Sequence, residues 1–123
     1  MKLWKQALNI ALGLIKDPKP KIVCICGSTR YPEALEQAYL NEVMAGHIPL
    51  VFLGNSRKWH GNKKIKTQLD AMYKHKIEMA DEILVLNVDG YVGPSTASEV
   101  KHARWLGKKI RWLEPEESND KNC

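Results

Sequence analysis

Lys21-Ile-Val-Cys-Ile-Cys-Gly-Ser-Thr-Arg30 is the stretch of sequence that decides the fold. Its first part, residues 21–26, is a short apolar run rich in β-branched residues, which is typical of a strand buried on both faces of a sheet. A glycine turn follows at Gly27, and Pro32 is suited to the first turn of a helix. The order strand, glycine turn, helix predicts the first unit of a parallel α/β sheet.

The rest of the chain alternates between strand and helix patterns. We expect helices over 32–46, 65–80 and 96–106, and strands over 48–53, 83–86 and 109–113. The last strand alternates charged and apolar residues, so we expect it at an edge of the sheet. In the first of these helices, Leu35, Tyr39 and Val43 form the expected buried stripe.

This alternation predicts a single α/β domain, a three-layer sandwich of the Rossmann- or flavodoxin-like kind. We expect a mainly parallel sheet of four to five strands, with an additional N-terminal helix. Right-handed crossovers would bring loops 27–31, 54–64 and 87–95 to the carboxyl edge of the sheet. Ligands bind at that edge in such folds, so these loops are the places to look for chemistry.

The two ends of the chain lie outside the expected α/β domain. In residues 2–16, apolar side chains recur at helical spacing, which predicts an amphipathic helix within a segment 1–17. The sequence leaves open whether this helix covers the core or forms a subunit contact. Residues 18–115 form the expected α/β domain, and 116–123 form a polar tail.

Composition excludes several classes of protein. The length of 123 residues suits one domain, and 44% hydrophobic with 27% charged residues is the composition of a globular protein. A net charge of +5 suits a phosphate-bearing partner. Three cysteines with a Cys-x-Cys spacing predict neither a disulfide framework nor a zinc pair, so we expect a reducing cytoplasm. No cluster of His, Cys and carboxylate residues has metal-ligand spacing, so we expect no metal, and we also expect no cofactor. No apolar run approaches the ~18 residues of a membrane span, and we expect no membrane partner.

The turn after the first strand is the first candidate site. Backbone N–H groups of a glycine turn at a helix N-terminus suit a phosphate. Ser28 and Thr29 add hydroxyl groups, and Arg30 adds a planar fork of donors. The alternative is a plain turn in which Ser28 or Thr29 caps the helix.

The second candidate lies in Gly93-Pro-Ser-Thr-Ala-Ser-Glu99. Thr96 and Glu99 have the spacing of a capping box, in which the glutamate only bonds the backbone of the cap. In the functional interpretation, Glu99 is a carboxylate at a helix N-terminus on the binding edge. There the helix dipole would keep it ionised, and it could act as a nucleophile.

Two further regions carry polar side chains of interest. Loop 57–64 places basic residues around Trp59. In the functional interpretation the loop would grip a nucleic-acid strand or stack a base, and in the alternative it is a mobile loop in solvent. Along the following helix, Asp70 is expected toward the binding edge. Lys76 is expected at the far edge, where it would compensate the helix dipole.

The blocks Ile22–Arg30, Met79–Val85, Ser95–Ala103 and Gly107–Ile110, with their spacing, resemble the nucleoside 2-deoxyribosyltransferase superfamily. The resemblance covers residues 21–114, with a poorly matched middle. Within the superfamily, the pattern is most similar to the 2′-deoxynucleoside 5′-phosphate N-hydrolase branch.

The resemblance implies an enzyme that cleaves or transfers an N-glycosidic bond. Glu99 matches the nucleophile of the family, and Ser28 and Arg30 match the residues that hold a 5′-phosphate. Thr96 matches a threonine of the transferase branch. The resemblance also implies a homodimer or a larger homo-oligomer in which a neighbour completes the site.

Some positions depart from the family pattern. Ala97 and Ser95 replace two glycines of the hydrolase branch, and Gly93 replaces an aspartate of the transferase branch. The helix aspartate of the hydrolase falls at Tyr73, and the resemblance implies that Asp70, one turn earlier, would take its place.

The sequence hypothesis is therefore an N-glycosidase acting on a nucleoside 5′-monophosphate. Its phosphate would lie on Gly27, Ser28, Thr29 and Arg30, and its sugar over Glu99. Tyr91 would line the sugar pocket beside Gly93 and Ser95, and Trp59 would stack on the base. The competing hypotheses are a nucleotide-binding module without catalysis, a deoxyribosyltransferase and a nucleic-acid-binding domain, of which we least expect the last.

Overall fold

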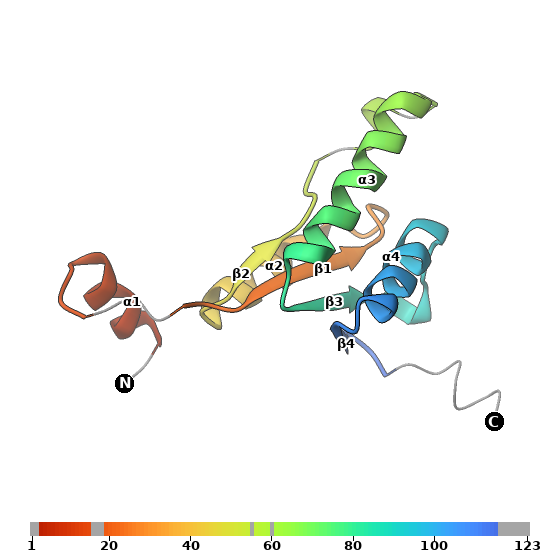
Figure 1. Ribbon diagram of the computed structural model, residues 1–123. Helices are drawn as coiled ribbons and strands as arrows, with labels where there is room; N and C mark the ends of the chain where they lie inside the picture. The colour runs from red at the N-terminus through yellow and green to blue at the C-terminus, as the bar shows by residue number, and fades with distance from the viewer. Residues whose placement is uncertain (1–2, 16–18, 55, 60, 116–123) are drawn as a thin grey trace.

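Four parallel strands form the sheet at the centre of the molecule (Figure 1). The computed structural model describes residues 3–15, 19–54, 56–59 and 61–115. The strands are β1 (Ile22–Gly27), β2 (Ile48–Leu50), β3 (Glu82–Leu86) and β4 (Lys109–Trp112). Their spatial order is β2-β1-β3-β4, so β4 is an edge strand as predicted.

Helices cover both faces of the sheet and complete the predicted three layers. One face packs Val23, Ile25 and Leu84 against α2 (Pro32–Met44). The other face packs Cys24 and Cys26 beneath α3 (Lys63–Met79) and α4 (Pro94–Trp105). Two short 3-10 helices, η1 (Ser56–Trp59) and η2 (Val88–Gly90), lie in loops at the carboxyl edge. The α/β sandwich with an all-parallel sheet is confirmed.

Several element boundaries differ from the predictions. Strand β2 ends at Leu50 rather than residue 53, because the chain then leaves the sheet and Phe52 packs on Trp59. Helix α4 begins at Pro94 rather than Thr96, since proline is well suited to the first helical position. The predicted buried stripe of α2 is correct only at Leu35, because Tyr39 and Val43 are exposed. The buried residues of this helix are Leu35, Ala38 and Glu42.

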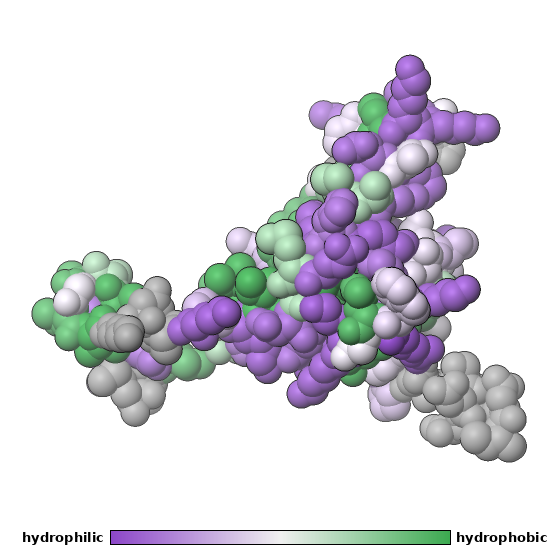
Figure 2. Space-filling view, viewed as in Figure 1, coloured by the Kyte–Doolittle hydropathy of each residue, from purple (hydrophilic) through white to green (hydrophobic). Residues whose placement is uncertain are grey.

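The N-terminal helix α1 (Leu3–Ala11) is shorter than the predicted 2–16, whose first and last residues lie outside the described ones. It ends because Gly13 adopts a positive φ of 73°, which lets the N–H of Leu14 bond to the carbonyl of Asn9 at 2.8 Å. None of its residues is buried, and it stands away from the sheet beyond the amino ends of the strands (Figure 1). Its apolar side chains form a separate patch in Figure 2.

No helix in the described part of the chain has the length and apolar character needed to span a membrane.

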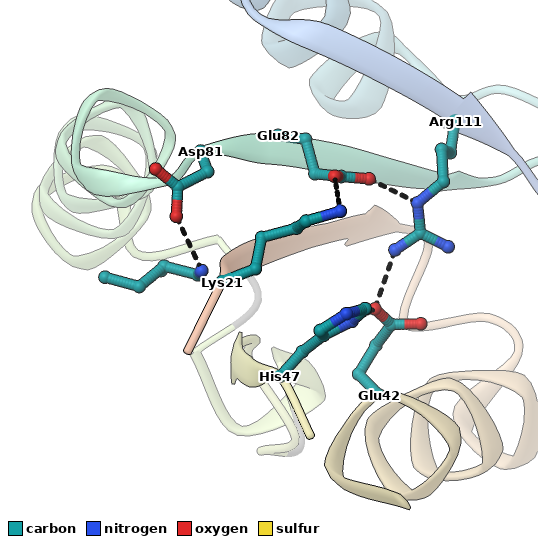
Figure 3. Close-up of polar contacts among 7 residues, drawn as sticks. Lys21, Glu42, His47, Asp81, Glu82 and Arg111 are labelled. Atoms are coloured by element: carbon teal, nitrogen blue, oxygen red, sulfur yellow. Dashed lines mark hydrogen bonds and ion pairs between the residues drawn. The ribbon is translucent and has the colours of Figure 1, made fainter. Parts of the chain in front are cut away.

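A group of ion pairs ties α2 to the sheet near the amino edge (Figure 3). Arg111 on β4 donates hydrogen bonds to Glu82 on β3 and to Glu42 on α2, the latter at 2.6 Å. Lys21 lies 2.8 Å from Glu82, and His47 lies 2.8 Å from Glu42. Glu42 is buried because these partners lie under α2, which explains why the buried stripe contains a charged residue.

Candidate functional site

A cavity of about 540 Å³ lies at the carboxyl edge of the sheet. Its walls come from the Gly27 turn, the segment between β2 and α3, one side of α3, the loop before α4 and the first turns of α4. It brings together ten of the eleven residues expected from the sequence, from four separate segments. These ten are Gly27, Ser28, Thr29, Trp59, Asp70, Tyr91, Gly93, Ser95, Thr96 and Glu99.

Glu99 lines this cavity from the second turn of α4. The N-cap of the helix is Gly93, without a side-chain cap, so Thr96 is the third residue of the helix. The predicted capping box is therefore absent, because Pro94 begins the helix before Thr96. Thr96 and Glu99 are both buried, and Glu99 is only 8% exposed. The carboxyl group is thus available to the cavity rather than used to cap the helix.

The surroundings of Glu99 determine its protonation. Burial raises the pKa of its carboxyl group to about 7, although the charge of Lys74 and a hydrogen bond with the Cys26 thiol act to lower it. The nearby charge of Asp70 raises it further. The expectation that the helix dipole keeps Glu99 fully ionised does not hold, because burial of the carboxyl group raises its pKa. Near neutral pH, Glu99 can therefore hold or release a proton.

The Gly27 turn forms the floor of the cavity beside β3. A Cβ at Gly27 would lie 3.0 Å from the Cβ of Leu86, so a larger residue would push the turn away from β3. Ser28 Oγ accepts a hydrogen bond from the N–H of Arg30 at 3.1 Å, which stabilises the turn. The N-cap of α2 is Tyr31, and no side chain caps that helix. The alternative in which Ser28 or Thr29 caps α2 is therefore not observed.

Arg30 is the one expected residue that does not line the cavity. Its guanidinium lies 4.3 Å from the ring centre of Tyr91, which does line it. Tyr31 contacts the same ring edge to face, with centroids 6.2 Å apart. This contact with Tyr91 holds Arg30 next to the cavity, on the outer side of a residue that lines it, and we call this position the cavity mouth.

Helix α3 supplies a polar wall that sequence reasoning largely missed. Asn62 caps the helix by accepting a hydrogen bond from the N–H of Ile65 at 3.1 Å. Lys66 Nζ lies 3.3 Å from Asp70 and donates to Ser95 Oγ at 3.2 Å, which joins α3 to the start of α4. The spacing of Lys66, Asp70 and Tyr73 on one helix face was the signal for this wall.

Lysine side chains make much of this wall positive. Lys63, Lys66 and Lys76 all line the cavity. The expectation that Lys76 lies at the far edge is wrong, because its amino group extends back over the ring of Tyr73, 4.8 Å from the ring centre. Such a wall attracts anionic ligands.

Aromatic side chains form another part of the lining. Trp59 and Phe52 lie with ring centres 6.1 Å apart, and both line the cavity. Tyr73 lines it too, and its hydroxyl donates a hydrogen bond to the carbonyl of Ile25 in β1. Phe52 was not predicted, because the sequence placed it in a strand. The cavity thus joins flat apolar surfaces to a positive wall and a buried carboxyl group.

No family model matches the chain, and comparison with curated proteins and with solved structures gives no significant match.

Proposed function

We propose that the protein is an N-glycosidase that cleaves the base–sugar bond of a nucleoside 5′-monophosphate, with Glu99 as the nucleophile. The observation that carries the proposal is the position of Glu99. It is buried in a cavity that it shares with the Gly27 turn and three lysines, and it has no role as a helix cap. The resemblance of the Gly27 and Glu99 segments to nucleoside 2-deoxyribosyltransferases supports the same function.

The parts of the cavity suit the parts of such a substrate. The 5′-phosphate would bind at the Gly27 turn, where Ser28 and Thr29 offer hydroxyl groups and backbone N–H groups meet the start of α2. Lys66 and, from the cavity mouth, Arg30 would neutralise its charge. The base would lie against Trp59 and Phe52, since aromatic rings stack on any base.

The reaction then needs two steps. An oxygen of Glu99 attacks the anomeric carbon while the bond to the base breaks, and the base nitrogen keeps the bonding electrons and takes up a proton from water. The sugar passes through a cation-like state that the carboxylate stabilises. Water then attacks the same carbon, loses a proton, and releases the sugar phosphate from Glu99. Asp70, which faces the cavity beside Lys66, would orient that water or a sugar hydroxyl.

We expect this enzyme to act in the cytoplasm, without a metal or cofactor, as a homodimer or larger homo-oligomer.

The test is to incubate the protein with a panel of ribo- and deoxyribonucleoside 5′-monophosphates and to follow free base by chromatography. We expect base release from at least one nucleotide and a loss of about a thousandfold or more in Glu99→Gln. Glu36→Gln, an exposed glutamate on α2, is the matched control and should retain full activity. Addition of a second free base distinguishes transfer from hydrolysis, because a transferase would then form a new nucleoside.

A nucleotide-binding module without catalysis is the second candidate. It is favoured by the raised pKa of Glu99, because a carboxyl group that is only partly ionised at neutral pH is a weaker nucleophile. Ala97 and Ser95 also favour it, since they stand where the hydrolase branch of the resembling family has glycines. Calorimetry with the same nucleotides separates the two. Tight binding by both the parent protein and Glu99→Gln, with no base release from any nucleotide, would establish the binding module and exclude the glycosidase.

A further inference from the structure

Helix α1 has a broad apolar surface that nothing in the described structure covers. On α1, Trp4 and Leu8 are 56% and 49% exposed and Leu3 is 50% exposed, and Leu12 and Leu14, which follow the helix, are 61% and 68% exposed. These side chains form the hydrophobic patch that stands apart from the domain in Figure 2. At helical spacing, the polar residues Lys5, Gln6 and Asn9 share the remaining, narrower side.

The segment that contains this helix carries an excess of positive charge. Residues 1–21 contain five lysines and one aspartate, which gives a net charge of +4. No acidic residue precedes Asp17. An apolar face with a tryptophan, bordered by lysines, is the pattern of a helix that lies in the interface of a membrane with anionic lipid headgroups.

We infer that α1 binds reversibly to the surface of a membrane that contains anionic phospholipid. The helix would lie in the plane of the surface, with Leu3, Trp4 and Leu8 between the acyl chains and Lys5 among the headgroups. The expectation of no membrane partner rested on the lack of a spanning segment, which surface binding does not require. A protein–protein contact fits less well, because lysine is depleted at the centre of such interfaces.

The position of α1 is compatible with an accessible cavity. Leu3 approaches Gly46 at the C-terminal end of α2, where a Cβ on the glycine would lie 3.9 Å from the Leu3 side chain. That end of the molecule faces away from the Gly27 turn and the start of α4 (Figure 1). A surface-bound protein would therefore keep the carboxyl-edge cavity open to solvent.

The first measurement is cosedimentation of the full chain with phosphatidylcholine vesicles, with and without phosphatidylserine. We expect binding at least about tenfold tighter when phosphatidylserine is present, and weaker binding as salt increases. The double variant Leu8→Gln/Leu12→Gln should lose binding. The triple variant Lys2→Gln/Lys5→Gln/Lys16→Gln should bind at least about tenfold more weakly.

A matched control uses apolar residues on a different surface. Leu40 and Met44 on α2 are 52% and 58% exposed, and Leu40→Gln/Met44→Gln should leave vesicle binding unchanged. No residue of α1 is buried and Leu12 is 61% exposed, so the Leu8→Gln/Leu12→Gln variant should keep the folded domain. Circular dichroism and thermal melting can check the fold of every variant. Glu99→Gln should also bind vesicles normally, so this test is independent of the proposed glycosidase.

The proposal would be overturned by equal sedimentation with and without phosphatidylserine, or by loss of binding in the α2 control. It would also be overturned if the parent protein does not sediment with either vesicle and light scattering shows a dimer that Leu8→Gln/Leu12→Gln dissociates. In that case the apolar face of α1 belongs to a contact with a second copy of the chain.

Discussion

Buried glutamates lie at both edges of the sheet, and burial has opposite outcomes for them. At the amino edge, burial alone would raise the pKa of the Glu82 carboxyl group, but hydrogen bonds from Lys21 and Arg111 lower it below its ordinary value (Figure 3). At the carboxyl edge, burial raises the pKa of Glu99 to about 7, because the nearby lysines compensate only in part.

The difference shows which carboxyl groups serve the fold and which is available for chemistry. Glu82 and Glu42 each contact a lysine or arginine at 2.8 Å or less, and their charges are compensated within the structure. Near Glu99, Lys66 bonds to Asp70 and Ser95, and Lys74 bonds to Ser98 Oγ at 2.8 Å. A buried, cavity-facing carboxyl group with a strongly shifted pKa is the usual mark of a functional site.

Replacement of Arg111 by alanine should have the largest effect. It leaves Glu82 without its bond from β4 and Glu42 with His47 alone, so we expect the free energy of unfolding at neutral pH to fall by about 3–5 kcal/mol. Carboxyl groups with a lowered pKa stabilise the fold above their ordinary pKa and lose that contribution as the pH falls through the lowered value. The difference between variant and parent should therefore shrink below about pH 4. Urea unfolding across this range measures it, and a loss of equal size at every pH would contradict the prediction.

Glu99→Gln should have the opposite effect on stability. A carboxyl group with a raised pKa stays protonated in the folded protein while it ionises in the unfolded chain, so stability falls as the pH rises from about 4.5 to about 7. Glutamine avoids this loss, and we expect the variant to be more stable than the parent by about 3 kcal/mol at most above pH 7. The two proteins should unfold at similar urea concentrations near pH 4. A variant that is less stable at pH 8 would show that Glu99 is a structural residue.

The pH dependence of cleavage tests the same carboxyl group in the reaction. A nucleophile must be ionised, so kcat/KM should rise by about tenfold for each pH unit between about 5 and 7 and then level off. The substrate phosphate titrates at about pH 6, which overlaps the range expected for Glu99. The same profile should therefore also be recorded with a nucleoside that lacks the phosphate. A profile that is flat for both substrates would show that ionisation of Glu99 does not limit the reaction.

Much of the fold could be predicted because its signals are local. Apolar runs such as 22–26 form buried strands wherever helices cover both faces, and right-handed crossovers then bring their loops to one edge. This reasoning also placed Gly27 and Glu99 in the same cavity.

The rest depends on contacts between distant residues. Glu42 is buried because Arg111, 69 residues away, donates to it, and periodicity within α2 cannot reveal such a partner. In the positive wall of α3, Lys66 donates to Ser95, 29 residues away at the start of α4, and a local pattern does not reveal such a contact. The pKa of Glu99 follows from its burial, whereas the sequence suggested only the helix dipole.

Replacement of Lys21 by methionine should have the smallest effect and sharpen the comparison at the amino edge. Lys21 contacts Glu82 at 2.8 Å, but its side chain is 42% exposed and Arg111 remains bound to the same carboxylate. Because the lysine is exposed to solvent and Arg111 still compensates the buried Glu82, we expect a loss of no more than about 1 kcal/mol, and less in high salt. Urea unfolding at low and high salt measures this contribution. A loss as large as that of Arg111→Ala would show that Glu82 depends on both cations, and that Arg111 alone does not compensate the charge of this buried carboxylate.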